Sequence, residues 1–161
     1  MTRAPDRGER TLELGRSGDS FDEVLRFAER ATSACTPECR EAVTLAVSEL
    51  GENLLKYGER NGMPHAGTID VQVEEKLVRV RATNRVTSLD DARHVAELVA
   101  ELERAGVSVE ALYSARLRDL FARPDEPRTR LGLLRMAFEG GFRLSYCFEA
   151  PELQIIAERS C

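Results

Sequence analysis

Hydrophobic residues recur at helical spacing in five segments of the chain. Ser20 begins a capping-box pattern, so the first of these helices is predicted over residues 21–31. Thr36 as the N-cap and Pro37 at the first helical position predict a longer second helix, and Gly58 together with Asn61-Gly62 indicates where it ends. Three shorter helices are predicted farther along the chain, over residues 89–102, 109–120 and 129–139.

Strict alternation of apolar and polar residues predicts five β-strands. Two pairs of these strands are neighbours in sequence, which favours antiparallel pairing, and helices that each bury one stripe favour a single helical layer. We therefore predict an α/β fold, a two-layer sandwich of a mixed, mostly antiparallel sheet with helices on one face. The predicted strands span residues 11–14, 68–73, 77–82, 142–148 and 153–157.

The length and charge of the chain limit its organisation and its partners. With 161 residues it is about the size of one domain, and we expect a flexible tail over residues 1–10 and a folded domain over residues 11–161. The net charge of −5 provides no positive field for nucleic acid or an anionic membrane. No segment has the apolar run of a secretory signal or a membrane span. We therefore expect a cytoplasmic protein. A homodimer is also compatible with the sequence, because apolar residues on the helices could pack against a second copy as well as in the core.

The four cysteines are Cys35, Cys39, Cys147 and Cys161. They lack the paired spacing of a zinc site, and only two histidines are present to assist them. For a cytoplasmic protein we expect these cysteines to be reduced, structural thiols.

The predicted second helix carries three polar groups on one side. Glu49, Asn53 and Lys56 stand at positions i, i+4 and i+7, and at about 100° per residue they fall within about 60° of arc beside an apolar stripe. The amide oxygen is a hard ligand suited to Mg²⁺, the carboxylate is a ligand or a base, and the ammonium is a counter-charge for phosphate. The alternative is an ordinary solvated flank, because any amphipathic helix has polar residues beside its stripe.

These three residues, followed by Tyr57, resemble the N-box of the GHKL or histidine-kinase-like ATPases, in which an Asn-x-x-Lys-Tyr run closes the nucleotide-site helix. The resemblance implies a Bergerat-type ATPase fold that binds ATP. It also implies that Asn53 is a ligand of Mg²⁺ and that Lys56 and Tyr57 help to hold the nucleotide. Glu49 would then be the catalytic residue, which orients or deprotonates the attacking group.

Two later segments resemble the glycine boxes of that family in reduced form. The strand before the third helix ends in Asn84, where the anti-sigma kinase branch has an adenine-reading Asp followed by glycines, and a carboxamide can also pair with adenine. Thr129, Arg130 and Gly132 stand in a reduced second glycine box, and the resemblance implies that they hold phosphate at a helix N-terminus. The polar segment 123–128 before them is a candidate lid. Two alternatives stay open: Asn84 as a turn former and Gly132 as a helix-packing residue.

The order of these features resembles the SiaB-type subgroup of the anti-sigma-factor kinases, over about residues 38–158. This resemblance implies an ATP-binding regulatory protein, a Ser/Thr kinase that uses Mg²⁺ and ATP to phosphorylate a small anti-sigma-antagonist-like protein in a bacterial partner-switching pathway. The competing hypothesis is a catalytically inactive scaffold of the same fold, which binds a regulatory protein without nucleotide. Absence of the Asp-x-Gly-x-Gly pattern favours the scaffold, whereas the complete set of Glu49, Asn53 and Lys56 favours the kinase.

Overall fold

The computed structural model describes residues 10–15, 20–61, 67–86, 88–104, 108–123 and 129–161, without the side chains of 57–61 and 129–130. Five strands and five helices follow one another in these segments. Their bounds are β1 (Arg10–Leu14), α1 (Phe21–Ala31), α2 (Pro37–Asn61), β2 (Gly67–Val73), β3 (Leu77–Arg85), α3 (Leu89–Glu103), α4 (Val109–Ala122), α5 (Thr129–Phe138), β4 (Arg143–Glu149) and β5 (Glu152–Ser160).

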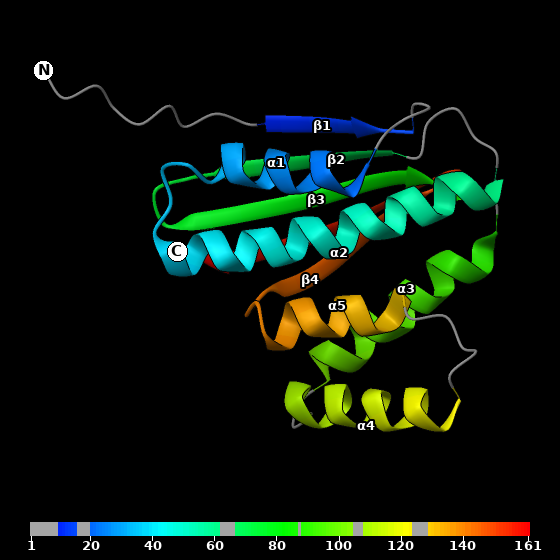
Figure 1. Ribbon diagram of the computed structural model, residues 1–161. Helices are drawn as coiled ribbons and strands as arrows, with labels where there is room; N and C mark the ends of the chain where they lie inside the picture. Colours follow the sequence, from blue (N-terminus) through cyan, green and yellow to red (C-terminus); the bar gives the residue numbers. More distant parts are fainter. Residues whose placement is uncertain (1–9, 16–19, 62–66, 87, 105–107, 124–128) are drawn as a thin grey trace, which may run out of the picture.

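The strands form a single sheet in the order β1-β2-β3-β5-β4. Every described pair of neighbouring strands is antiparallel, so the mixed sheet of the sequence prediction is antiparallel throughout the described residues. Figure 1 shows helices α1, α2 and α5 on one face of this sheet, with α4 lying farthest from it. The predicted two-layer α/β sandwich is therefore confirmed.

The long helix α2 supplies the centre of the core. The predicted apolar stripe of this helix is buried against the sheet, with alternate residues of β2 and β3 on the other side of the interface. Helix α4, in contrast, contributes no fully buried residue and packs mainly on α5. The core residues of the stripe are Val43, Ala46, Val47, Leu50 and Leu54.

Several element boundaries differ from the sequence prediction by a few residues. Helix α2, in contrast, passes through Gly58 and ends at Asn61, within the predicted exit region, because one helical glycine costs only about 1 kcal/mol, which the packing of a long helix offsets. Strand β3 extends beyond residue 82 to Arg85, and β1 begins at Arg10, a residue predicted to belong to the tail. The remainder of that tail lies outside the described residues. None of the described helices is long and apolar enough to cross a membrane.

A disulfide joins the start of α2 to the segment after β5 and corrects the expectation of four reduced thiols. Cys39, near the start of α2, is bonded to Cys161 after β5, with a Cα–Cα distance of 5.6 Å and a sequence separation of 122. Cys35 and Cys147 are free. Sequence spacing gave no sign of the bond because the two cysteines become neighbours only when β5 pairs with β3 in the centre of the sheet.

Candidate functional site

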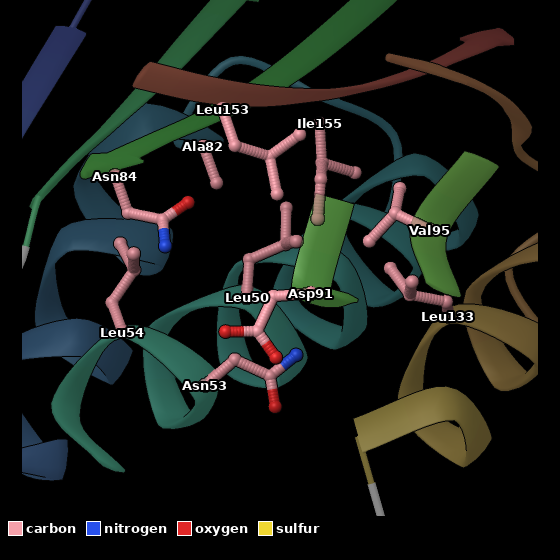
Figure 2. A pocket seen from close by; sticks show the side chains of 10 residues that line it. All are labelled: Leu50, Asn53, Leu54, Ala82, Asn84, Asp91, Val95, Leu133, Leu153 and Ile155. Carbon is pink, nitrogen blue, oxygen red and sulfur yellow. The ribbon is translucent and has the colours of Figure 1, made fainter. Parts of the chain in front are cut away.

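A cavity lies between α2, the inner face of the sheet, α3 and α5 (Figure 2). Its walls come from seven apolar side chains, whereas the side chains of Asn53, Asn84 and Asp91 provide its polar groups. The volume of about 40 Å³ has room for about three water molecules at roughly 10–15 Å³ each. The structure therefore brings Asn53 of the predicted N-box together with Asn84 of the predicted adenine site.

The polar side chains around this cavity do not stabilise the fold through contacts with other described side chains. Among the described residues, none of the three side chains has a hydrogen-bond or ion-pair partner. Asn84 is the most enclosed of them, with only 8% of its surface exposed. Because buried amides in folded proteins almost always have partners, an unpartnered amide facing a cavity indicates a place for water or a ligand.

Strand alternation explains how Asn84 reaches the cavity. Alternate residues of β3 point toward the helices and are buried, beginning at Val78 and continuing through Val80 and Ala82. The next position in this series is Asn84, opposite Leu153 of β5. The sequence thus places a carboxamide where the strand pattern calls for an apolar side chain.

We expect Asn84→Leu to stabilise the ligand-free protein by about 1 kcal/mol, because an unpartnered buried amide costs roughly 1–3 kcal/mol and cavity water offsets part of that cost. Urea unfolding of the variant and the wild-type protein measures the difference. Thr83→Val is the matched control, because Thr83 is the neighbouring residue on the opposite face of β3. In the structure Asn84 lies within β3 opposite Leu153, so the turn-former alternative does not hold. A destabilised Asn84→Leu variant would show that the amide contributes to the stability of the ligand-free protein.

Asp91 is a site residue that the sequence did not single out, because with Ser88 it fits a helix-capping pattern. In the structure, the hydroxyl of the N-cap Ser88 accepts a hydrogen bond from the backbone N–H of Asp90, at 3.2 Å. The Asp91 side chain lines the cavity instead. The signal that could have revealed it is its position four residues before the buried Val95, which places a carboxylate on the inward stripe of α3.

Glu49 lies one helical turn before Asn53 but does not line the cavity. Its carboxylate accepts a hydrogen bond from Arg135 of α5, with 2.9 Å between Oε1 and Nη1, and its side chain is 17% exposed. Arg135 also donates to Glu139 at 2.8 Å, and this hydrogen bond raises the pKa of the Arg135 guanidinium. The hydroxyl of Tyr113 completes the group by donating to Glu139 at 3.4 Å. The predicted catalytic acid is therefore part of a polar connection between α2, α5 and α4.

Gly132 packs directly against this carboxylate. A Cβ atom at position 132 would lie 2.6 Å from Oε2 of Glu49, closer than packed atoms come. The absence of a side chain therefore lets α5 approach Glu49, which is the helix-packing role that the sequence left open for this residue. This contact leaves the predicted phosphate contact of Gly132 untested.

The remaining predicted site residues lie apart from the cavity or outside the described residues. The Lys56 ammonium pairs with Glu52 at 3.0 Å, and its side chain is 58% exposed. It lines a separate hollow beside Phe21 and Leu55. The side chains of Tyr57, Thr129 and Arg130 lie outside the described residues, as do residues 124–128 of the candidate lid.

The residues beside Asn53 fit a hard divalent cation. Asn53 is half-buried at the cavity, its amide has no partner among the described residues, and the Asp91 carboxylate lines the same space. Mg²⁺ prefers oxygen ligands from one or two protein side chains and completes its shell with water or phosphate oxygens. A site of one amide and one carboxylate meets that requirement.

The fold is shared with a solved protein. A chain in the crystal structure of the SiaB–SiaC complex from Pseudomonas aeruginosa matches this chain with a TM-score of 0.67. The match covers 93% of this chain and 88% of that chain, at 19% sequence identity. No protein-family model matches the sequence, and a search of curated proteins finds no match. The likeness therefore shows a common fold, the antiparallel two-layer sandwich described above.

Proposed function

We propose that this protein is an ATP-binding regulatory protein that phosphorylates a serine or threonine of a small anti-sigma-antagonist-like partner in a bacterial partner-switching pathway. The observation that carries the proposal is the set of unpartnered polar side chains around an apolar cavity between the N-box helix and the sheet. The fold shared with a chain of the SiaB–SiaC complex supports a regulatory protein as the partner.

In this proposal the cavity receives the adenine ring. Its apolar walls would pack against the faces of the ring, and the Asn84 amide offers both a donor and an acceptor to the ring edge. Nucleotide pockets are typically about 300–1,000 Å³, so the side chains around the present cavity of about 40 Å³ must move apart to admit adenine. Asp91 and Val95, both on α3, form one wall, which makes α3 the element we expect to shift.

Phosphoryl transfer requires mainly positioning and charge neutralisation, for which few residues suffice. Asn53 would hold Mg²⁺, which supplies positive charge to the phosphates when it is bound. The first turn of α5, which begins at Thr129, would present backbone N–H groups to negative charge. Glu49 would accept the proton of the incoming hydroxyl, held in position by Arg135.

The competing proposal is the scaffold that binds a regulatory protein without nucleotide. Two observations favour it: Glu49 and Lys56 are both paired with other side chains of the protein, and the cavity is small. The two proposals make opposite predictions for ATP, so one binding experiment separates them.

We expect Mg²⁺-ATP to raise the melting temperature of the purified protein. A ligand that binds only the folded state stabilises it by about 2.7 kcal/mol when its concentration is about 100 times its dissociation constant. Asn53→Ala should remove the magnesium-dependent part of the shift while the variant stays folded. Differential scanning calorimetry with ATP, with and without Mg²⁺, measures both effects.

Glu52→Gln is the matched control, because Glu52 is the exposed neighbour of Asn53 on α2 and pairs only with Lys56 among the described residues. We expect this variant to keep the full shift. Absence of any shift in the wild-type protein at millimolar Mg²⁺-ATP would contradict the kinase proposal and leave the scaffold.

A further inference from the structure

The first turn of α3 carries two acids that differ in their surroundings. Asp90 is exposed and pairs with Arg93, with 3.6 Å between the charged atoms. Asp91 is half-buried, and its carboxylate has no hydrogen-bond or ion-pair partner among the described residues. Helix N-termini favour acids, but Asp90 already meets that preference at the surface. The dipole of α3 therefore does not explain why a second carboxylate faces the cavity.

Asp91 faces the residue predicted to bind metal. Figure 2 shows its carboxylate directed toward the same end of the cavity as the Asn53 amide, with Asn84 at the other end. The two side chains come from different elements, α3 and α2. A carboxylate beside a bound triphosphate would repel it unless a cation stood between them.

We propose that Asp91 is a second protein ligand of a divalent cation, which it shares with Asn53. One carboxylate oxygen and one amide oxygen are hard ligands, and water or phosphate oxygens would complete the shell of a Mg²⁺ ion. Asn84, an unpartnered amide more than nine-tenths buried on the same cavity, independently indicates that the space receives a ligand. The inference rests on the proposed function for the purpose of the cation, but the site itself is testable without nucleotide.

A cation held in this way would connect two elements of the domain. Asn53 belongs to the central helix α2, whereas Asp91 stands at the start of α3, the element that we expect to shift when adenine enters. Binding of the cation would therefore fix α3 relative to α2. Loading of Mg²⁺ and closure of the nucleotide pocket would then be one coupled event.

Mn²⁺ is the probe, because its electron paramagnetic resonance signal reports the free ion. We expect the full-length wild-type protein to bind one Mn²⁺ per chain saturably in the absence of nucleotide. Asp91→Asn should lower the affinity for Mn²⁺ by at least about 10- to 100-fold. This is the loss that follows when even a group that only supports a metal ligand is removed. Asp90→Asn is the matched control, because it removes an identical charge from the adjacent surface position, and it should bind Mn²⁺ as the wild-type protein does.

An exchange of the two side chains separates ligation from a structural role. The double variant Asn53→Asp/Asp91→Asn keeps one carboxylate and one amide at the site, so it should recover Mn²⁺ binding to within a few-fold of wild type. Equal Mn²⁺ binding by the wild-type, Asp91→Asn and Asp90→Asn proteins, or no saturable site in any of them, would overturn the inference. An unchanged Mn²⁺ affinity in Asp91→Asn together with a reduced preference for ATP over GTP would overturn it in favour of a hydrogen bond from Asp91 to the base.

The Mn²⁺ result and the ATP result are independent. A thermal shift by Mg²⁺-ATP that is identical in the wild-type and Asp91→Asn proteins leaves the proposed function standing and removes the metal role of Asp91. Binding of Mn²⁺ that depends on Asp91, without any response to ATP, supports the cation site and contradicts the proposed kinase.

Discussion

Replacing Cys161 with serine is expected to lower the free energy of unfolding by about 4 kcal/mol under oxidising conditions. The reason is the long loop closed by the bond between Cys39 and Cys161, which are 122 residues apart. A cross-link of that span removes much of the conformational freedom of the unfolded chain, by about 4.7 kcal/mol for a loop of about 100 residues in the loop-entropy treatment. Urea unfolding with and without a thiol reductant measures the loss.

The effect should be confined to stability and to this pair of cysteines. Reductant should destabilise the wild-type protein to the level of Cys161→Ser and leave that variant unchanged. Cys147→Ser, which removes a free and exposed thiol, should unfold at the wild-type denaturant concentration. Equal unfolding midpoints for Cys161→Ser and the oxidised wild-type protein would show that the cross-link contributes nothing.

The disulfide and the cavity lie at different parts of α2. Cys39 is the third residue of the helix, and Asn53 lies fourteen residues later, about 21 Å along the axis at about 1.5 Å per residue. We therefore expect the Cys161→Ser protein to keep its thermal response to Mg²⁺-ATP at temperatures where it is folded.

The elements of this fold follow from local pattern, whereas their long-range arrangement does not. Helical spacing and strand alternation indicated all ten described elements, since each depends on neighbours within one or two turns. The pairing of β3 with β5, which joins the two hairpins, connects residues as distant as Leu77 and Ser160. Alternation of apolar and polar residues indicates which side chains share a face of a strand, but it does not specify the partner strand. Neither this pairing nor the Cys39–Cys161 bond could therefore be predicted from the sequence.

In the candidate site, too, some residues could be predicted from the sequence, whereas their contacts depend on how distant elements pack. Asn53 was predicted from its position at the border of a helical stripe and Asn84 from the resemblance to the anti-sigma kinases, and the structure brings both to one cavity. The pairing of Glu49 with Arg135 depends on how α5 docks on α2, which no local pattern specifies. Asp91 was missed because a first-turn acid has a ready explanation in helix capping, although its place on the inward stripe distinguished it from Asp90.

Replacing Glu49 with glutamine is expected to lower phosphoryl transfer by about 100- to 10,000-fold, the range over which a positioned proton acceptor contributes. Glutamine keeps the size of the side chain, so the close contact with Gly132 and a hydrogen bond from Arg135 are preserved. What is lost is the ability to take the proton from the attacking hydroxyl. The measurement is single-turnover transfer of radiolabelled γ-phosphate to a panel of small anti-sigma-antagonist-like proteins from the source organism.

The position of Glu49 separates this variant from those at the cavity. Because Glu49 does not line the cavity, Glu49→Gln should keep the thermal shift with Mg²⁺-ATP that Asn53→Ala loses.

Glu139→Gln is the matched control, because it removes the other carboxylate bound to Arg135 and leaves Glu49 in place. Transfer should therefore fall by less than about tenfold in this variant. Equal losses in the two variants would mean that Glu49 acts only by holding Arg135 and α5 in position. Unchanged transfer in Glu49→Gln would exclude Glu49 as the proton acceptor, and absence of labelled partners with the wild-type protein would favour the scaffold.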